Sequence, residues 1–296
     1  MAEVETPVSE RPVLVGGTGR SGSTIVGHLL DHHPRLALTR PMEVRFLAGR
    51  FGLADALAAS LSGDAVSAAD QPSAALAVER IMNRWYTRAP DVGLHTSISR
   101  DDLAMMLDEY VTGMKEDPLR ATRGLARVVM QRVAGVDVRW VDTTPANARQ
   151  ADRLVMIYPQ ARIISVVRDG RDVAASFVQQ TFGPDDVFEA LRQWERRMMR
   201  IHQATLAAPE GMVLRIELMD LVVHDRRGTV SRVCEFLGIN DDPAMLEWFD
   251  SVISASSAHP GRWRTQFDAP TARLIDRAYG KSVKRLESAG VSVPGE

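Results

Sequence analysis

Short apolar runs alternate along the chain with longer segments whose apolar residues recur every three or four positions. The runs near residues 12–16, 138–141, 162–168 and 211–216 predict strands, since buried parallel strands are almost continuously hydrophobic. Alternation of such strands with helices favours an α/β fold with a central, mostly parallel sheet flanked by helices. Helices are expected near residues 23–33, 44–60, 72–87, 100–115, 119–134, 146–158, 171–181, 185–207, 226–238, 243–253 and 271–289.

The stretch 46–134 is almost wholly helical and lies between the first and second predicted strands. We therefore expect a helical insertion after the first βα unit, lying over the carboxyl edge of the sheet and forming a pocket there. The periodic residues Leu103, Met106, Leu107 and Tyr110 indicate a helix face packed on the domain rather than a partner-binding face.

The whole chain, residues 1–296, is predicted to be one domain, because α/β folds often reach this length without dividing. No linker, low-complexity run or internal repeat interrupts it. Residues 1–11 are polar and acidic and are expected to be disordered.

Composition narrows the function classes. A net charge of −2 argues against a general nucleic-acid binder. Cys234 is the single cysteine, so no intrachain disulfide can form. His28, His32 and His33 lack carboxylate or cysteine partners at metal-ligand spacing, and we expect no metal. There is no apolar stretch of membrane-spanning length and no secretory signal, so a cytoplasmic protein is expected, its composition typical of a bacterium and a homodimer left open.

A glycine-rich loop at residues 16–24 follows the first predicted strand and leads into a helix. Strand, glycine loop and helix N-terminus together are a common way for α/β proteins to hold a phosphate. Gly17 and Gly22 have the spacing of the ATP-binding Walker A loop, but Ser23 stands where that loop has lysine. Arg20 is the loop's only cation. The loop therefore predicts an anion site that lacks the usual triphosphate machinery.

A second segment, residues 162–176, also combines a buried strand with polar groups. Arg168 ends the apolar run, at the carboxyl edge where open α/β sheets bind ligands. Ser176 follows eight residues later, about two helical turns along. An arginine and a hydroxyl placed in this way could hold a second anion.

In these segments the chain resembles the sulfotransferases that use 3′-phosphoadenosine 5′-phosphosulfate (PAPS). Residues 17–24 resemble the family loop that binds the 5′-phosphosulfate, and residues 166–176 the segment that binds the 3′-phosphate. Residues 141–145 and 154–159 resemble the lead-in to that second segment, and residues 261–264 the Gly-x-Trp-Lys loop that closes over the cofactor. The resemblance covers about residues 12–45 and 138–267, whereas residues 46–137 carry no motif that we can assign.

The resemblance implies a P-loop NTPase-like sulfotransferase fold, PAPS as donor and adenosine 3′,5′-bisphosphate as product. Arg20 would stabilise charge on the leaving phosphate, as an electrostatic clamp rather than a proton donor, since arginine does not readily release a proton. The cofactor-binding residues implied are Gly19, Arg20, Ser21, Gly22, Ser23, Thr24, Arg168, Ser176, Gly261, Arg262, Trp263 and Arg264.

The acceptor hydroxyl needs a base. Glu43 resembles the glutamate that tyrosyl-protein and several bacterial sulfotransferases use, with two extra residues before it, and Arg45 would orient Glu43 or the acceptor. Glu43 could instead be a helix N-terminal acid paired with Arg45 or Arg40. His95 is the alternative base, although its segment matches no family motif.

Other polar and aromatic residues are weaker candidates for the acceptor site. Asp142 and Thr144 follow a predicted strand and should face the cleft, where the family's lysine is replaced by Thr143. Trp85, Tyr86 and Arg88 could line an acceptor pocket or simply finish a helix.

The sequence thus predicts a sulfotransferase acting on a hydroxyl of a small or medium-sized metabolite, of the kind found in secondary metabolism. A P-loop kinase-like phosphotransferase and a non-catalytic nucleotide-binding relative are the alternatives. Ser23 in the lysine position argues against the kinase.

Overall fold

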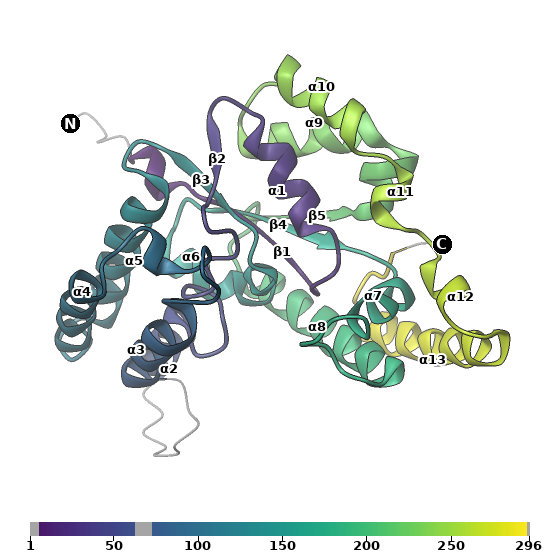
Figure 1. Cartoon of the computed structure of the whole chain (residues 1–296), viewed down its shortest axis with the longest axis horizontal. Coiled ribbons are helices and arrows are strands. Elements are labelled where there is room, and N and C mark those ends of the chain that lie inside the picture. The colour runs from purple at the N-terminus through teal and green to yellow at the C-terminus, as the bar shows by residue number, and fades with distance from the viewer. Residues whose placement is uncertain (1–5, 63–72, 295–296) are drawn as a thin grey trace.

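The computed structural model describes residues 6–62 and 73–294. Within these ranges the centre is a five-stranded, all-parallel sheet with strand order β2-β3-β1-β4-β5 (Figure 1). This confirms the predicted α/β fold with a parallel sheet between helices. The strands are β1 (Val13–Gly17), β2 (Leu36–Leu38), β3 (Arg139–Asp142), β4 (Arg162–Val167) and β5 (Val213–Glu217).

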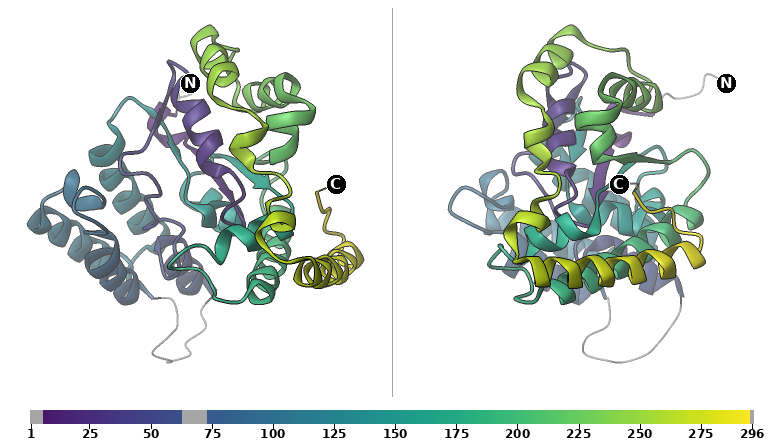
Figure 2. Two further views of the ribbon diagram at one scale, coloured as in Figure 1. Left: turned by 45° about the vertical axis from the view of Figure 1, so that its right-hand side comes forward. Right: turned by 90° about the vertical axis from the view of Figure 1, so that its right-hand side faces the viewer.

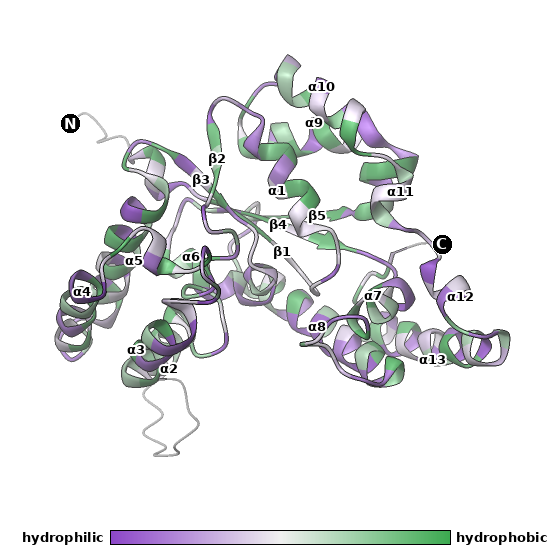
Figure 3. Ribbon diagram, viewed as in Figure 1, coloured by the Kyte–Doolittle hydropathy of each residue, from purple (hydrophilic) through white to green (hydrophobic). Residues whose placement is uncertain are grey.

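Successive residues of β1 point to opposite faces of the sheet, as the two-residue period of a strand requires. Val13 and Val15 pack with helices α1 (Ser23–Asp31), α9 (Arg226–Leu237) and α10 (Pro243–Val252). Leu14, between them, packs on the other face with residues of α6 (Ala151–Ile157) and α8 (Val187–Ala207). Both faces are therefore covered, which explains the nearly continuous hydrophobic runs at residues 13–15 of β1 and 163–167 of β4 (Figure 3).

The predicted insertion is helical and packs against the α6 side of the sheet. Figures 1 and 2 place it at the opposite end of the molecule from the C-terminal helices. Its elements are α2 (Leu53–Ser62), α3 (Ala74–Arg80), the π-helix η2 (Ile81–Trp85), the 3₁₀ turn η3 (Leu94–Thr96), α4 (Arg100–Gly113) and α5 (Pro118–Ala134). The remaining elements are η1 (Val8–Glu10), η4 (Pro145–Gln150), α7 (Gly170–Phe177), η5 (Asp220–His224), α11 (Ala255–Ala258), α12 (Arg262–Gln266) and α13 (Ala269–Ser288).

Two predictions about the elements were wrong: the start of one helix, and the absence of a strand before the insertion. The helix expected from residue 44 begins only at Leu53, because Glu43, Arg45 and Phe51 have left-handed φ values of 56°, 58° and 61° and break any regular turn. The strand β2 was not predicted, so the insertion follows β2 rather than the first βα unit.

The expected disorder of residues 1–11 falls partly on residues 1–5, which lie outside the described residues. The prediction is wrong for Val8–Glu10, which forms a 3₁₀ turn. Its Ser9 carbonyl accepts a 2.9 Å hydrogen bond from the indole of buried Trp140, and this bond attaches the segment to β3. Among the described helices none is long and apolar enough to cross a membrane.

The register of β1 and β4 decides where the two predicted anion-binding segments lie. These strands are parallel neighbours, with Gly17 paired to Val166. The glycine loop after β1 and the Arg168 segment after β4 therefore leave the sheet side by side at its carboxyl edge, where open α/β sheets bind ligands.

Candidate active site

The glycine loop forms a concave array of backbone donors. Gly19 and Gly22 have φ values of +83° and +103°, and an added Cβ at Gly22 would lie 2.6 Å from Leu218 Cδ1, so both turns favour glycine. Throughout the described chain, no protein acceptor pairs with the backbone N–H groups from Gly19 to Thr24. A run of unpaired N–H groups at the N-terminus of α1 is suited to hold an anion.

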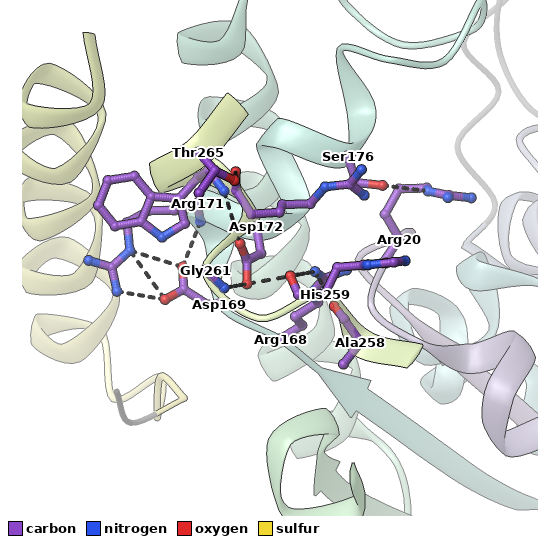
Figure 4. A network of polar contacts seen from close by, with 12 residues as sticks. Arg20, Arg168, Asp169, Arg171, Asp172, Ser176, Ala258, His259, Gly261 and Thr265 are labelled. Carbon is purple, nitrogen blue, oxygen red and sulfur yellow. Dashed lines mark hydrogen bonds and ion pairs between the residues drawn. The ribbon is translucent and has the colours of Figure 1, made fainter. Parts of the chain in front are cut away.

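The second anion segment touches this loop directly. Arg20 Nε donates a 3.0 Å hydrogen bond to Ser176 Oγ on α7, and Figure 4 shows the two side chains pointing toward each other. Arg168 Nη1 donates to the Arg20 carbonyl at 3.1 Å. Arg168 is 8% exposed, and burial lowers its pKa although the nearby Asp172 carboxylate acts in the opposite direction. The residues expected at the two ends of a nucleotide are therefore adjacent.

Asp172 holds the segment 258–263 against these residues. Its carboxylate accepts hydrogen bonds from the backbone N–H groups of Gly261, at 2.9 Å, and Trp263, at 3.3 Å. It also lies 3.6 Å from Arg168 Nη2. The same nitrogen of Arg168 donates to the Ala258 carbonyl at 2.6 Å. Figure 4 shows this network between α7 and the α11–α12 connection. It fixes Arg168 at the rim of the site.

One cavity of about 930 Å³ contains most of the predicted site residues. Its volume lies in the range of ligand pockets, roughly 300–1,000 Å³. The predicted residues that line it are Gly19, Arg20, Gly22, Ser23, Thr24, Glu43, Arg45, Trp85, Thr144, Arg168, Ser176 and Arg262. The glycine loop, the Arg168 segment and Glu43 therefore share one site.

Three predicted cofactor residues, Gly261, Trp263 and Arg264, do not line this cavity. Trp263 is 4% exposed and packs in the α7–α13 core, with the guanidinium groups of Arg171 and Arg264 at 4.7 Å and 4.6 Å from its ring. Gly261 contributes its N–H to Asp172 rather than to the cavity. Within the described residues, Arg262 is the member of the 261–264 loop that reaches the cavity. Ser21 also does not line the cavity, although its N–H belongs to the loop array.

Three predicted acceptor residues also lie elsewhere. Asp142 is buried beneath the site, and burial raises its pKa. Tyr86 donates to the Ile98 carbonyl at 3.3 Å. The ring nitrogens of His95 face the carbonyl oxygens of Tyr86 and Pro90, at 2.9 Å and 2.8 Å. These two contacts raise the pKa of His95, with the Pro90 carbonyl contributing more, and leave neither nitrogen aimed at the cavity.

Glu43 lies on the cavity wall, where its side chain forms an ion pair with Arg45. Its carboxylate accepts from the guanidinium of Arg45, with Nε at 3.0 Å. Arg88 donates to the Glu43 carbonyl at 2.8 Å. The backbone just after Glu43 is fixed by Asp142, whose carboxylate accepts a hydrogen bond from the Val44 N–H at 3.0 Å. Glu43 is thus not a helix N-terminal acid, because the next helix begins at Leu53, and Asp142 contacts the backbone of this turn rather than the cavity.

Several cavity residues were missed by the sequence reasoning, and most are arginines. Arg149 and Arg197 lie beside the loop, and Arg197 donates to the Thr18 carbonyl at 2.7 Å. Burial, with the charge of Arg197 as a smaller cause, lowers the pKa of Arg149 to about 10. Arg80 and Arg84 lie across the cavity. The spacing of residues 80 and 84 on the helix predicted over residues 72–87 was a readable signal, since positions four apart share a face.

A family model described as the sulfotransferase family matches residues 12–243. The chain therefore belongs to the sulfotransferase family. The match spans both anion segments, Glu43 and the helical insertion. A comparison with curated protein sequences gives no match.

Solved structures agree on the fold at low sequence identity. The sulfotransferase domain of the curacin biosynthetic pathway matches with a TM-score of 0.57 and 15% identity, covering 98% of this chain and 100% of that domain. The sulfotransferase domain of the Synechococcus PCC 7002 olefin synthase gives 0.52 and 17%, covering 99% and 98%. A sulfotransferase from Alicyclobacillus acidocaldarius gives 0.51 and 15%, covering 97% and 96%. The chain thus has the P-loop-like sulfotransferase fold.

Proposed function

We propose that the protein transfers a sulfuryl group from PAPS to a hydroxyl group of a small or medium-sized metabolite. The observation that carries this proposal is the contact of Arg20 with Ser176 inside one cavity. It joins a phosphate-type glycine loop to a second anion site, as a nucleotide with phosphates at both its 5′ and 3′ positions requires.

The residues present fit this donor. The unpaired N–H groups from Gly19 to Thr24, with the hydroxyls of Ser23 and Thr24, would hold the 5′-phosphosulfate at the N-terminus of α1. Arg168 and Ser176 would hold the 3′-phosphate. When bound, PAPS supplies the sulfuryl group and adenosine 3′,5′-bisphosphate as the leaving group.

Arg20 would stabilise negative charge on the leaving phosphate. A guanidinium does not readily give up a proton, so the contribution of Arg20 would be electrostatic. Fixed charges aimed at developing negative charge are usually the largest single contribution to catalysis of this kind. The left-handed φ of 57° at Arg20 is a strained conformation of the kind that concentrates at functional sites.

Glu43 is proposed as the general base that accepts the proton of the acceptor hydroxyl. The acceptor oxygen would then form its bond to sulfur as the bond from sulfur to the phosphate oxygen breaks. Arg45 would orient the carboxylate, as its two contacts with Glu43 already do. The engagement of both ring nitrogens of His95 with carbonyls favours Glu43 over His95 for this role.

The test is transfer of labelled sulfate from PAPS to compounds in an extract of the source organism, followed by mass spectrometry. The proposal expects products heavier by SO₃ that disappear in Glu43→Gln. ATP serves as the control donor. Phosphorylated products in its presence, with none from PAPS, would instead indicate a kinase.

A further inference from the structure

The cavity walls are far more basic than the chain. The whole chain has a net charge of −2, yet the described residues lining the cavity include ten arginines and a single carboxylate, Glu43. These arginines are Arg20, Arg45, Arg50, Arg80, Arg84, Arg88, Arg149, Arg168, Arg197 and Arg262. A cleft lined by one sign of charge concentrates ligands of the opposite sign.

The ten fall into two sets from different parts of the fold. The loop-side arginines, which lie on the glycine loop, η4, α8, α12 and directly after β4, surround the anion segments. They are Arg20, Arg149, Arg168, Arg197 and Arg262. The insertion-side arginines come from the 43–52 turn, α3, η2 and the residues just after it. They are Arg45, Arg50, Arg80, Arg84 and Arg88. The two phosphates and the sulfate of PAPS account for the first set only.

The insertion-side arginines are not balanced by carboxylates of the protein. Glu43 contacts Arg45, and its Oε2 lies 3.9 Å from Arg88. Across residues 6–62 and 73–294, the structure gives Arg50, Arg80 and Arg84 no ion pair. The Nε of Arg80 is buried without a hydrogen-bond partner among the described residues, an unfavourable state for a charged donor.

Two of these side chains are nevertheless held in place. The guanidinium groups of Arg50 and Arg80 lie 4.7 Å and 5.4 Å from the centre of the Phe51 ring. Arg50 and Arg80 thus both contact one aromatic ring through their cationic groups. Arg84 lies on the π-helix η2, an element that is rare and often found at functional sites. Positioned cations that lack a protein anion are arranged for an anion from outside.

We propose that the acceptor is itself an anion: a hydroxyl compound that carries a phosphate, sulfate or carboxylate group, bound by Arg80, Arg84 and Arg50. This inference rests on the proposed function and specifies its acceptor. The guanidinium forks match such oxyanions with paired hydrogen bonds. The anionic group would hold the acceptor on the insertion side of the cavity and leave its hydroxyl for Glu43.

The test is calorimetric titration of inorganic pyrophosphate into protein already saturated with adenosine 3′,5′-bisphosphate, which fills the loop-side anion sites. We expect pyrophosphate to bind the wild type and to bind Arg84→Gln at least about tenfold more weakly, the loss of one charge-assisted contact. Arg84 is exposed, so the variant should fold. Arg132→Gln, on the exposed face of α5 and outside the cavity, is the matched control and should bind as the wild type does.

The outcomes separate the two proposals. Equal pyrophosphate affinity in the wild type and Arg84→Gln, or none in either, would overturn the anionic acceptor while leaving the sulfotransferase proposal intact. If the bisphosphate itself does not bind, the donor assignment fails. Pyrophosphate alone then decides the inference: a two-site isotherm reduced to one site by Arg84→Gln supports it, and an unchanged isotherm overturns it. In the transfer assay, products whose only acidic group is the new sulfate would also contradict it.

Discussion

Arg20 and Ser176, 156 positions apart in the sequence, are joined by a 3.0 Å hydrogen bond from Nε to Oγ. The bond connects the loop after β1 to the helix after β4, and the parallel pairing of those strands makes it geometrically available. Because Arg168 also donates to the Arg20 carbonyl, the two anion segments are mechanically linked. A ligand that spans both segments should therefore bind more tightly than one that occupies either alone.

Replacing Arg168 should distinguish the binding of the 3′-phosphate from the binding of the rest of the nucleotide. Arg168→Ala is expected to weaken adenosine 3′,5′-bisphosphate by about 10- to 100-fold, the loss of hydrogen bonds from a charged donor. It should weaken 5′-AMP much less, because 5′-AMP has no 3′-phosphate. Calorimetric titration of both ligands measures the difference, and equal losses would refute the assignment of Arg168.

Removing the proposed base should affect chemistry rather than binding. Glu43→Gln is expected to lower kcat by about 10²- to 10⁴-fold, the usual contribution of a general base, while adenosine 3′,5′-bisphosphate binds as before. His95→Gln is the control and should keep its kcat, since both ring nitrogens already contact carbonyls. Steady-state kinetics with PAPS would assign the role elsewhere if Glu43→Gln turned over normally.

His95 should make stability depend on pH. Its folded-state pKa is raised, first by the Pro90 carbonyl and then by the Tyr86 carbonyl, because the imidazolium can donate to both. The stabilisation is therefore fully present below the unfolded-state pKa of about 6.5 and is lost as pH rises through the folded-state pKa. Denaturant unfolding of the wild type and His95→Gln across this range checks the sign, and a difference that grows with rising pH would contradict it.

Two glycine substitutions should have opposite effects. Gly22→Ala places a Cβ 2.6 Å from Leu218 Cδ1 at a φ of +103°, so it should distort the loop and abolish nucleotide binding. Gly124→Ala lies inside α5 with nothing within 4 Å, and should stabilise the fold by up to about 1 kcal/mol. Thermal unfolding with and without adenosine 3′,5′-bisphosphate measures both, and retained binding in Gly22→Ala would count against the loop assignment.

The sheet was predictable because its strands are buried on both faces. Val13–Gly17 and Arg162–Val167 show this as nearly unbroken hydrophobic runs, and both lie where the sequence indicated. Leu36–Leu38 was missed because three residues are too few to establish any period. The early helix start was wrong because Val44, Leu47 and Phe51 are buried within an irregular turn, where their spacings of three and four residues imitate a helix.

The site was predictable where local motif and strand end coincide, as at Arg20 and Arg168. The burial of Trp263 away from the cavity was not predictable, because it depends on packing against Arg171 and α13, which are distant in sequence. The basic character of the insertion side was also missed. Arg80 and Arg84 become a site only when the 43–52 turn brings Phe51 against Arg80.

The measurement that tests the central claim most directly is the unfolding free energy of the wild type with and without adenosine 3′,5′-bisphosphate. At about 100 times its dissociation constant, the ligand should add about 2.7 kcal/mol, and ATP at the same concentration should add less. No stabilisation by the bisphosphate across that range, or a larger effect of ATP, would contradict the proposal that this cavity is built for PAPS.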